Sequence, residues 1–186
     1  MTEPYVRPAH SADLLSFAAT LGDHRFLSDR LDRQRKNLGV LFFAWLDCHP
    51  AGDVYLWLEE AEEWPIRRHL PGVALLTHLQ VHDELRNRGI GSSLVRAVEQ
   101  HLVEQGHERV ALAVRTDNHD AARLYRRLGY RDWGHGAVIC HAQRSLPDGG
   151  IREEPERCHV LAKDLPRPSP PMPRSGAGTV GATRRV

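Results

Sequence analysis

Apolar residues recur along the chain with two periods, and these periods predict alternating helices and strands. The clearest helical segment is Ile90–Gln105, whose apolar residues fall three or four positions apart and which Gly106 ends. Short apolar runs bounded by Gly, Pro or Asp predict strands. The expected order is strand Tyr5–Arg7, helices Ser11–Leu21 and Phe26–Asn37, strands Val40–Leu46, Val54–Leu58 and Val73–Val81, helix Ile90–Gln105, strand Arg109–Val114, a helix from Asp117 or Asn118 through Leu128, and strands Tyr130–Trp133, Ala137–His141 and Arg157–Leu161.

Two stretches interrupt this pattern and a third ends it. Residues 50–53 read Pro-Ala-Gly-Asp, which predicts a turn between two strands. Residues 59–72 are irregular and rich in charge, and we expect an excursion or a short helix with a solvated face. After Leu165 the chain turns to Pro, Gly, Ala and Thr, which cannot bury a core. We therefore expect one domain over residues 1–165 and a disordered tail over residues 166–186.

One loop carries specific chemistry. Residues 86–91 read Arg-Asn-Arg-Gly-Ile-Gly and lie between an expected strand and an expected helix. Gly89 and Gly91 have no Cβ, so an anion can approach the main chain closely. The helix that follows offers unpaired N–H groups and the positive end of its dipole, and Arg86 and Arg88 add charge. The loop therefore predicts a site for a phosphorylated cofactor.

Two common phosphate loops do not fit these residues. A Walker A loop needs a lysine after its last glycine, but Ser92 follows Gly91. A dinucleotide fingerprint needs a third glycine where Leu94 stands, and a tighter turn than residues 82–88 allow. The cofactor is therefore expected to be neither a nucleoside triphosphate nor a dinucleotide.

A second pattern follows the loop. It consists of an asparagine, two alanines, a Leu-Tyr pair and a later Gly-Tyr pair, carried by Asn118, Ala121, Ala122, Leu124, Tyr125, Leu128, Gly129 and Tyr130. Together with Arg86, Gly89 and Gly91, these residues resemble motifs B and A of the GNAT superfamily of acyl-CoA-dependent N-acyltransferases. The order of elements over residues 5–165 is also similar to that fold.

The resemblance implies an α/β (α+β) architecture, the GNAT fold, with a mixed, mostly antiparallel sheet of six to seven strands and about four helices. The sheet would be splayed between the strands that end at Val81 and Val114. Acetyl-CoA would be the co-substrate, with its pantetheine arm in this gap and its pyrophosphate on the loop. The residues implied to bind it are Leu79, Gln80, Val81, Arg86, Asn87, Arg88, Gly89, Ile90, Gly91, Ser92, Asn118 and Tyr125.

The implied enzyme is an acetyl-CoA-dependent N-acetyltransferase, in which an amine attacks the thioester directly in a ternary complex. Tyr125 matches the family's proton-donor position, although it also lies on an apolar stripe where it can pack. His78 is the candidate base, but strict alternation aims it away from the face that Val81 uses unless a bulge re-aims it. Members that acetylate ribosomal-protein N-termini carry a glutamate where Ala113 stands, so the resemblance leaves the base open.

The resemblance does not name the acceptor, which is expected to be a primary amine of a small molecule or peptide. In this fold the acceptor is selected largely by the loops Gly22–Phe26 and, approximately, Ala142–Glu156. The second loop contains Asp148, Glu153, Glu154 and Glu156. We interpret them as an acidic rim for a cationic amine, such as an aminoglycoside, a polyamine or a peptide amine; an ordinary solvated loop explains them as well. A non-catalytic acyl-CoA sensor or assembly module is the alternative to an enzyme.

Composition narrows the remaining classes. The formal net charge of +1 gives no argument for nucleic acid or membrane partners. No apolar run approaches the ~20 residues that span a bilayer, and the N-terminus does not resemble a signal peptide, so we expect a cytoplasmic protein. Three cysteines, each followed by a histidine, lack the Cys-x-x-Cys spacing of zinc sites, and we expect no metal. The oligomeric state stays open, a homodimer included.

Overall fold

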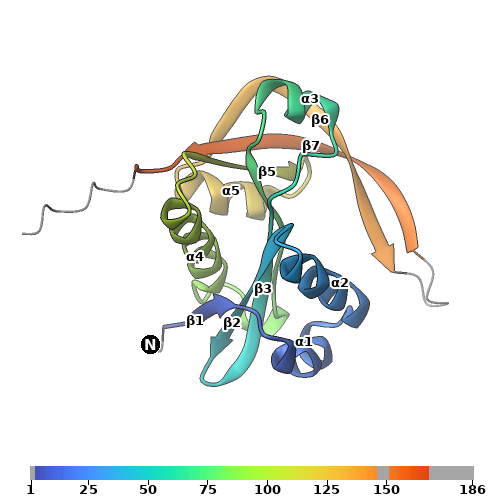
Figure 1. Ribbon diagram of the computed structural model, residues 1–186, viewed down its shortest axis with the longest axis vertical. Helices are drawn as coiled ribbons and strands as arrows, with labels where there is room; N and C mark the ends of the chain where they lie inside the picture. The colour runs from blue at the N-terminus through green and yellow to red at the C-terminus, as the bar shows by residue number, and fades with distance from the viewer. Residues whose placement is uncertain (1–2, 146–150, 168–186) are drawn as a thin grey trace, which may run out of the picture.

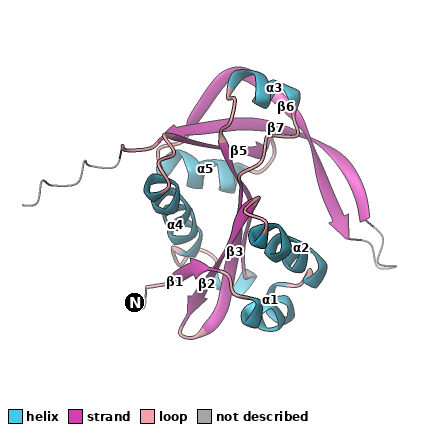
Figure 2. Cartoon of the chain, in the orientation of Figure 1, coloured by secondary structure: helices cyan, strands magenta, loops and turns pink. Residues whose placement is uncertain are grey.

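A seven-stranded sheet forms the centre of the computed structural model, which describes residues 3–145 and 151–167 (Figure 1, Figure 2). The strands are β1 Tyr5–Pro8, β2 Gly39–Leu46, β3 His49–Trp57, β4 Ala74–Val81, β5 Arg109–Arg115, β6 Arg131–Ser145 and β7 Ile151–Asp164. The α-helices are α1 Leu14–Leu21, α2 His24–Arg35, α3 Trp64–His69, α4 Ile90–Glu104 and α5 His119–Arg127. Within the described residues, no helix is long and apolar enough to cross a membrane.

The sheet has the spatial order β1-β2-β3-β4-β5-β7-β6 and is antiparallel except at its centre. There β4 and β5 run parallel, and they pair only through Ala74 with Val110 and Leu75 with Ala111 in the described part of the chain. Beyond Leu75 the two strands separate. The mixed, mostly antiparallel sheet and its splay, both expected from the resemblance, are confirmed.

Helices cover both faces of the sheet. On one face, α1 and α2 lie against β2 and β3, and Phe17 stacks on Phe43 there. On the other face lies α4, as Figure 1 shows. Its buried residues are those singled out by helical periodicity: Ile90, Leu94, Val95, Val98 and Leu102. Fully burying one Leu or Val side chain contributes roughly 1.5–3 kcal/mol, so this face anchors α4 firmly beside the splay.

The turn predicted at Pro50–Asp53 is wrong. The chain reverses at Asp47 and Cys48 instead, and both residues have positive φ, 48° and 66°. A two-residue turn of this kind matches the twist of a hairpin, which Pro and Gly further along the sequence concealed.

Pro50 fits inside β3 because it lies at a bulge. The register between β2 and β3 shifts between Ala44 and Trp45, and Pro50 pairs with Trp45 at this point. Proline is tolerated at bulges because a ladder hydrogen bond is already interrupted there. Asp53 consequently lies in the middle of a strand and not in a turn.

The last two strands form one long hairpin. The segments Tyr130–Trp133 and Ala137–His141, predicted as separate strands, both fall in β6, which begins at Arg131. The register against β7 shifts between them, where Gly134 and Gly136 take positive φ. The glycines that indicated a break therefore mark an irregularity within a single strand.

The loop predicted at about Ala142–Glu156 is mostly strand. Pairing between β6 and β7 continues from Ala142 with Glu154 to Ser145 with Ile151. Residues 146–150 lie outside the described residues. Polar residues dominate this part of the hairpin, so no apolar alternation was available to predict it.

Candidate active site

The separation of β4 from β5 leaves one edge of β4 without a strand partner. Past Leu75, β4 pairs only with β3 in the described part of the chain. The side chains of Leu79 and Val81 face α4, because a Cβ added to Gly91 would lie 3.8 Å from each of them. An unpaired strand edge can hydrogen-bond an extended ligand as an added strand. The β4 edge is thus suited to a linear chain that contains amides.

The side chain of Gln80 is hydrogen-bonded to neighbouring residues. Its side-chain Nε2 donates to the carbonyl oxygen of Leu21 at 3.0 Å, and so ties β4 to the end of α1. The side chain is therefore engaged in holding the splay next to α1.

The loop after β4 presents backbone N–H groups at the start of α4. Asn87 and Gly89 have positive φ, 62° and 84°, and Gly89 is the N-cap of α4. No described side chain caps the helix. The first N–H groups of α4, at Ile90, Gly91 and Ser92, therefore have no partner within the helix and can bind an anion at the positive end of its dipole.

The two glycines of the loop are needed for different reasons. A Cβ at Gly91 would lie 3.3 Å from Cδ2 of Leu124, so Gly91 allows α4 and α5 to approach. A Cβ at Gly89 would meet nothing within 4 Å, so Gly89 is needed for its backbone conformation. Arg86 pairs with Asp83 at 2.6 Å, and because both are exposed the pair is weak.

Asn118 and Tyr125 come from α5 and the turn before it. Oδ1 of Asn118 accepts from the N–H of Ala121 at 3.1 Å, which confirms Asn118 as the helix cap. Tyr125 is 6% exposed and packs edge-on against Tyr130, with ring centroids 5.7 Å apart. Burial raises the pKa of Tyr125 above its ordinary value of 10, so the phenol is protonated at neutral pH. Tyr125 packs in the core and also holds a proton that it can donate.

His78 lies on the face of β4 opposite to Val81. Alternation breaks just before it, because Leu76 and Leu79 both pack on the α4 side. The register against β3 also shifts here, and His78 has φ of 48°. The bulge includes His78 itself, and the alternation predicted between His78 and Val81 holds. His78 therefore points to the face that α2 covers.

On that face, His78 contacts two residues from neighbouring elements. The ring of Phe26 from α2 covers the imidazole, with centroids 3.8 Å apart. Nε2 of His78 lies 3.5 Å from Oδ2 of Asp53 on β3. Burial lowers the pKa of His78 to about 4, although Asp23 acts in the opposite direction. Hydration of the 31% of the side chain that stays exposed limits this shift.

Asp53 is the residue of this site that sequence analysis missed. It is 0% exposed, and neither carboxylate oxygen has a hydrogen-bond partner among the described residues. Burial raises the pKa of Asp53 well above 3.8, and the negative charge of Asp23 adds to this effect. The available signal was a single acid within the apolar run 51–58, but the Pro-Ala-Gly-Asp pattern concealed it.

Comparison with known protein families explains why this chain has splayed strands followed by an anion-binding loop and a helix. The sequence model of the acetyltransferase (GNAT) family matches residues 10–130. The chain belongs to the GNAT family of acetyltransferases. Membership makes it an acyltransferase by family, and confirms the resemblance drawn from motifs A and B. GNAT acetyltransferases use acetyl-CoA as acyl donor.

Solved GNAT structures share this fold at low sequence identity. The ribosomal-protein-S18-alanine N-acetyltransferase from Escherichia coli is 15% identical, with a TM-score of 0.62 over 92% of this chain and 99% of that chain. An acetyltransferase of the GNAT family from Streptococcus pneumoniae is 21% identical, with a TM-score of 0.61 over 88% and 100%. A GNAT family acetyltransferase from Elizabethkingia anophelis, with acetyl-CoA bound, is 13% identical, with a TM-score of 0.57 over 87% and 98%. These likenesses show the fold.

The acidic rim predicted on the last hairpin of this GNAT chain carries arginines as well. Glu154 and Glu156 each lie near an arginine, with N–O distances of 3.6 Å and 3.5 Å. Glu153 is exposed, and Asp148 lies outside the described residues. The rim therefore has less net negative charge than the sequence indicated, and its preference for a cationic amine stays a prediction.

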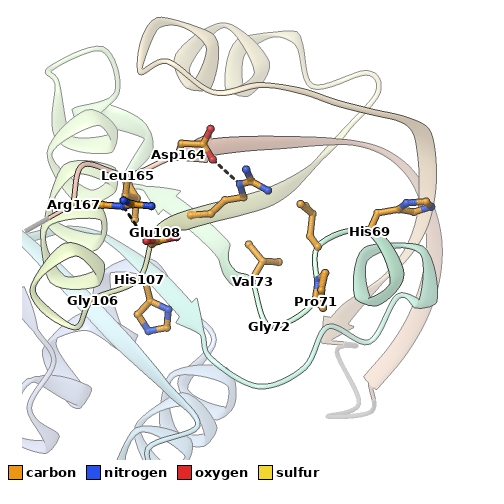
Figure 3. A pocket seen from close by; sticks show the side chains of 12 residues that line it. His69, Pro71, Gly72, Val73, Gly106, His107, Glu108, Asp164, Leu165 and Arg167 are labelled. Atoms are coloured by element: carbon orange, nitrogen blue, oxygen red, sulfur yellow. Dashed lines mark hydrogen bonds and ion pairs between the residues drawn. The ribbon is translucent and has the colours of Figure 1, made fainter.

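One cavity lies away from the splay. Figure 3 shows this cavity of about 700 Å³, which lies at the amino ends of β4 and β5. Its charged side chains are paired, Arg109 with Asp164 at 2.6 Å and Arg167 with Glu108 at 3.1 Å. The loop Arg86–Ser92 follows the opposite end of β4. We therefore do not assign this cavity to acetyl-CoA.

Metal-ligating side chains do not cluster in the described residues. Across residues 3–145 and 151–167, no three His, Cys, Asp or Glu side chains lie where they could hold one metal ion. Two of the Cys-His pairs lie on strands, Cys140-His141 on β6 and Cys158-His159 on β7, as the sequence predicted.

Proposed function

We propose that this GNAT chain is an N-acetyltransferase that moves an acetyl group from acetyl-CoA to a primary amine of a small molecule or peptide. The reaction is direct attack in a ternary complex. One observation carries this proposal: in a chain of this family, β4 separates from β5 beside a helix start whose N–H groups no side chain of the described residues caps. Such an arrangement can hold an extended arm and a pyrophosphate at the same time.

The donor would bind along β4 and its following loop. We infer that the pantetheine amides pair with the backbone edge at Leu79–Val81, and that the pyrophosphate accepts hydrogen bonds from the loop Arg86–Ser92. Asn118 adds a polar contact to the arm at the start of α5, since its Oδ1 caps the helix and its amide N–H groups are a separate donor.

Two side chains would move protons. As the amine nitrogen bonds to the thioester carbon, the C–S bond breaks and the thiolate takes a proton from Tyr125. A thiol has a pKa of about 8.5 and an ordinary phenol about 10, and burial raises the pKa of Tyr125 further, so transfer of its proton to the thiolate is uphill. The buried phenol keeps its proton until the thiolate forms. His78 is the base that takes the proton of the amine, and it is neutral at neutral pH as a base must be.

We infer that the acceptor belongs to one of two classes of amine. The E. coli structure is named for the alanine of a ribosomal protein, which makes a peptide amine one candidate class. A small cationic amine is the other, and the glutamates of β7 support it. A cytoplasmic location and a homodimer stay predictions.

The deciding experiment measures ligand stabilisation and then turnover. Acetyl-CoA at 100 times its dissociation constant should stabilise the fold by about 2.7 kcal/mol and raise its Tm, whereas NAD and ATP should not. Release of free thiol from acetyl-CoA, measured over a panel of alkylamines, polyamines, aminoglycosides and peptides, should then identify the acceptor class.

Two other results would change the assignment. Stabilisation by acetyl-CoA without thiol release from any amine would favour a non-catalytic acyl-CoA sensor, which the alanine at position 113 also suits. Stabilisation by NAD or ATP, with none by acetyl-CoA, would contradict donor binding at the loop.

A further inference from the structure

The burial of Asp53 needs a physical explanation. The carboxyl group is fully buried on the face that α2 covers, and neither oxygen has a hydrogen-bond partner among the described residues. Burying a carboxylate without a partner costs several kcal/mol, so most such groups in proteins are hydrogen-bonded or paired. His78 is a titratable neighbour, with its Nε2 3.5 Å from Oδ2 of Asp53.

The two side chains differ in their access to solvent. The side chain of Asp53 is 1% exposed, whereas that of His78 is 31% exposed. A molecule that enters from solvent can therefore reach the imidazole and not the carboxyl group. The bulge in β4 creates this arrangement, because it turns His78 toward Asp53, the β3 residue just before the register shift.

We propose that Asp53 is a positioning residue that shares one proton with His78, and that this pair receives the proton lost by the acceptor amine. The inference rests on the proposed N-acetyltransferase function. His78 is the catalytic member, because it alone can contact the amine. Asp53 acts through it by orienting the imidazole and by taking up its second proton.

The proton transfers balance without a further reactant. The N–H bond of the attacking amine breaks, and the proton bonds to the imidazole nitrogen that faces away from Asp53. The proton on Nε2 moves to Asp53, where a new O–H bond forms. The imidazole is neutral before and after, and the carboxyl group changes from charged to neutral. The proton returns to water by the reverse path after the product leaves, and Tyr125 regains from water the proton that it gave to the thiolate.

The charged groups around the pair support this direction of transfer. Asp23, in the turn before α2, raises the pKa of both members, and burial raises that of Asp53 further. Arg30 from α2 opposes proton uptake by His78, and a hydrogen bond with Gln80 favours it. Asp53 is therefore the member of the pair that is stabilised most by taking up a proton. The two groups titrate together as a coupled pair.

The test compares the wild-type chain with Asp53→Asn, His78→Gln and the double variant. The turnover number with acetyl-CoA and the best alkylamine of the panel is measured from neutral to alkaline pH. Near neutral pH each single variant should lower kcat by at least about tenfold, and the double variant should lose little more than either. At alkaline pH the loss should shrink, because more of the acceptor is already the neutral amine and hydroxide can take the proton that the attack releases.

A merely structural role for Asp53 makes different predictions. It would lower kcat by the same factor at every pH, or make the two single losses multiply, and either result overturns the proposal. Asp53→Asn should also keep or raise the Tm, because it removes a buried charge. Thr77→Val, on the same strand pair, is the matched control and should leave the pH profile of kcat unchanged, since Thr77 only donates to Tyr55 O at 3.2 Å.

The result also separates this inference from the proposed function. Thiol release by the wild type with unchanged pH profiles in both single variants refutes the shared proton and leaves the acetyltransferase intact. A wild type that releases no thiol with any amine refutes both. If Asp53→Asn does not fold, the alkaline limb of the His78→Gln profile decides: a loss that persists undiminished at alkaline pH overturns the proposal.

Discussion

At the scale of single residues, Tyr125 combines packing with a proposed proton transfer. Its ring is buried against Tyr130, so removing only the hydroxyl leaves the packing in place. We predict that Tyr125→Phe lowers kcat by at least about tenfold while the dissociation constant of acetyl-CoA stays near the wild-type value. Steady-state thiol release and a binding titration check this. Loss of affinity with unchanged kcat would contradict the proton-donor role.

His78 predicts a specific dependence of stability on pH. Its pKa is lowered from 6.5 to about 4 on folding, so between these values the unfolded state binds more protons. The stabilisation due to neutral His78 is therefore present above its unfolded pKa and is lost as the pH falls toward about 4. His78→Gln removes this pH-dependent contribution. As the pH falls from 6.5 to about 4, the free energy of unfolding of the variant should therefore rise relative to that of the wild type.

Urea denaturation at a series of pH values measures the difference. The raised pKa of Asp53 acts with opposite sign, because its contribution to stability is present at low pH and lost as the pH rises. The wild type should thus show a shallow acid dependence in which the two residues partly cancel. Parallel stability curves for His78→Gln and the wild type would contradict the assigned environment of His78.

The residues of the donor site were predictable because each motif is contiguous. Gly89, Gly91, Asn118 and Tyr125 occur at fixed spacings within two short segments. Asp53 was not predictable in this way, because its relation to His78 depends on a bulge and on the pairing of β3 with β4. A motif records local spacing, whereas a buried pair depends on the register of two strands.

At the scale of elements, the start of α4 determines whether an anion can be held. Gly89 and Gly106 lie just before and just after this helix, and both have positive φ, 84° and 81°. A Cβ at either one meets nothing within 4 Å, so Gly→Ala costs about 1–2 kcal/mol of backbone strain at each. The two substitutions are therefore matched in their effect on stability.

We predict that only Gly89→Ala weakens acetyl-CoA binding. A strained residue 89 tends to relax toward negative φ and re-aims the N–H groups of Ile90 and Gly91, whereas Gly106 lies at the far end of the helix. Isothermal titration of both variants with acetyl-CoA checks this, beside their urea denaturation curves. Equal affinities in the two variants would show that the loop geometry does not hold the pyrophosphate.

Element boundaries were predictable where periodicity was strong and not where turn residues misled. The apolar stripe of α4 identified its buried face correctly. Pro50 and Gly52 suggested a turn, but the tight turn is formed by Asp47 and Cys48. The pair Asp-Cys is not a recognised sequence signal for positive φ at both positions. The length of the strands in the last hairpin, β6 and β7, was underestimated because their polar residues show no alternation of apolar and polar positions.

At the scale of the whole molecule, the splay is a non-local feature. Two pairs of residues join β4 to β5, and β7 then fills the other side of β5 from Arg109 to Arg115. No property of β4 or β5 alone requires them to part. The resemblance to GNAT proteins supplied this expectation, whereas hydrophobic patterning gave only the order of elements. Patterning predicts which residues are buried, and pairing across distant segments decides where the sheet opens.

The boundary of the domain gives a last prediction, because the sequence placed it just after Leu165. Leu165 is 7% exposed, packs in the core cluster that contains α4, and donates its N–H to the carbonyl oxygen of Glu108 at 2.8 Å. Arg167 makes only an exposed pair with Glu108, which is worth little. Removing residues 168–186 should therefore leave both the free energy of unfolding and kcat unchanged.

A chain truncated three residues earlier makes the matched comparison. Removing residues 165–186 also deletes the Leu165 side chain from the core and should lower the free energy of unfolding by roughly 1.5–3 kcal/mol. Urea denaturation of the two truncated chains, together with thiol release, distinguishes them. A loss of stability or turnover on removing residues 168–186 alone would show that the proline-rich segment belongs to the folded domain or its active site, and would move the predicted boundary toward the C-terminus.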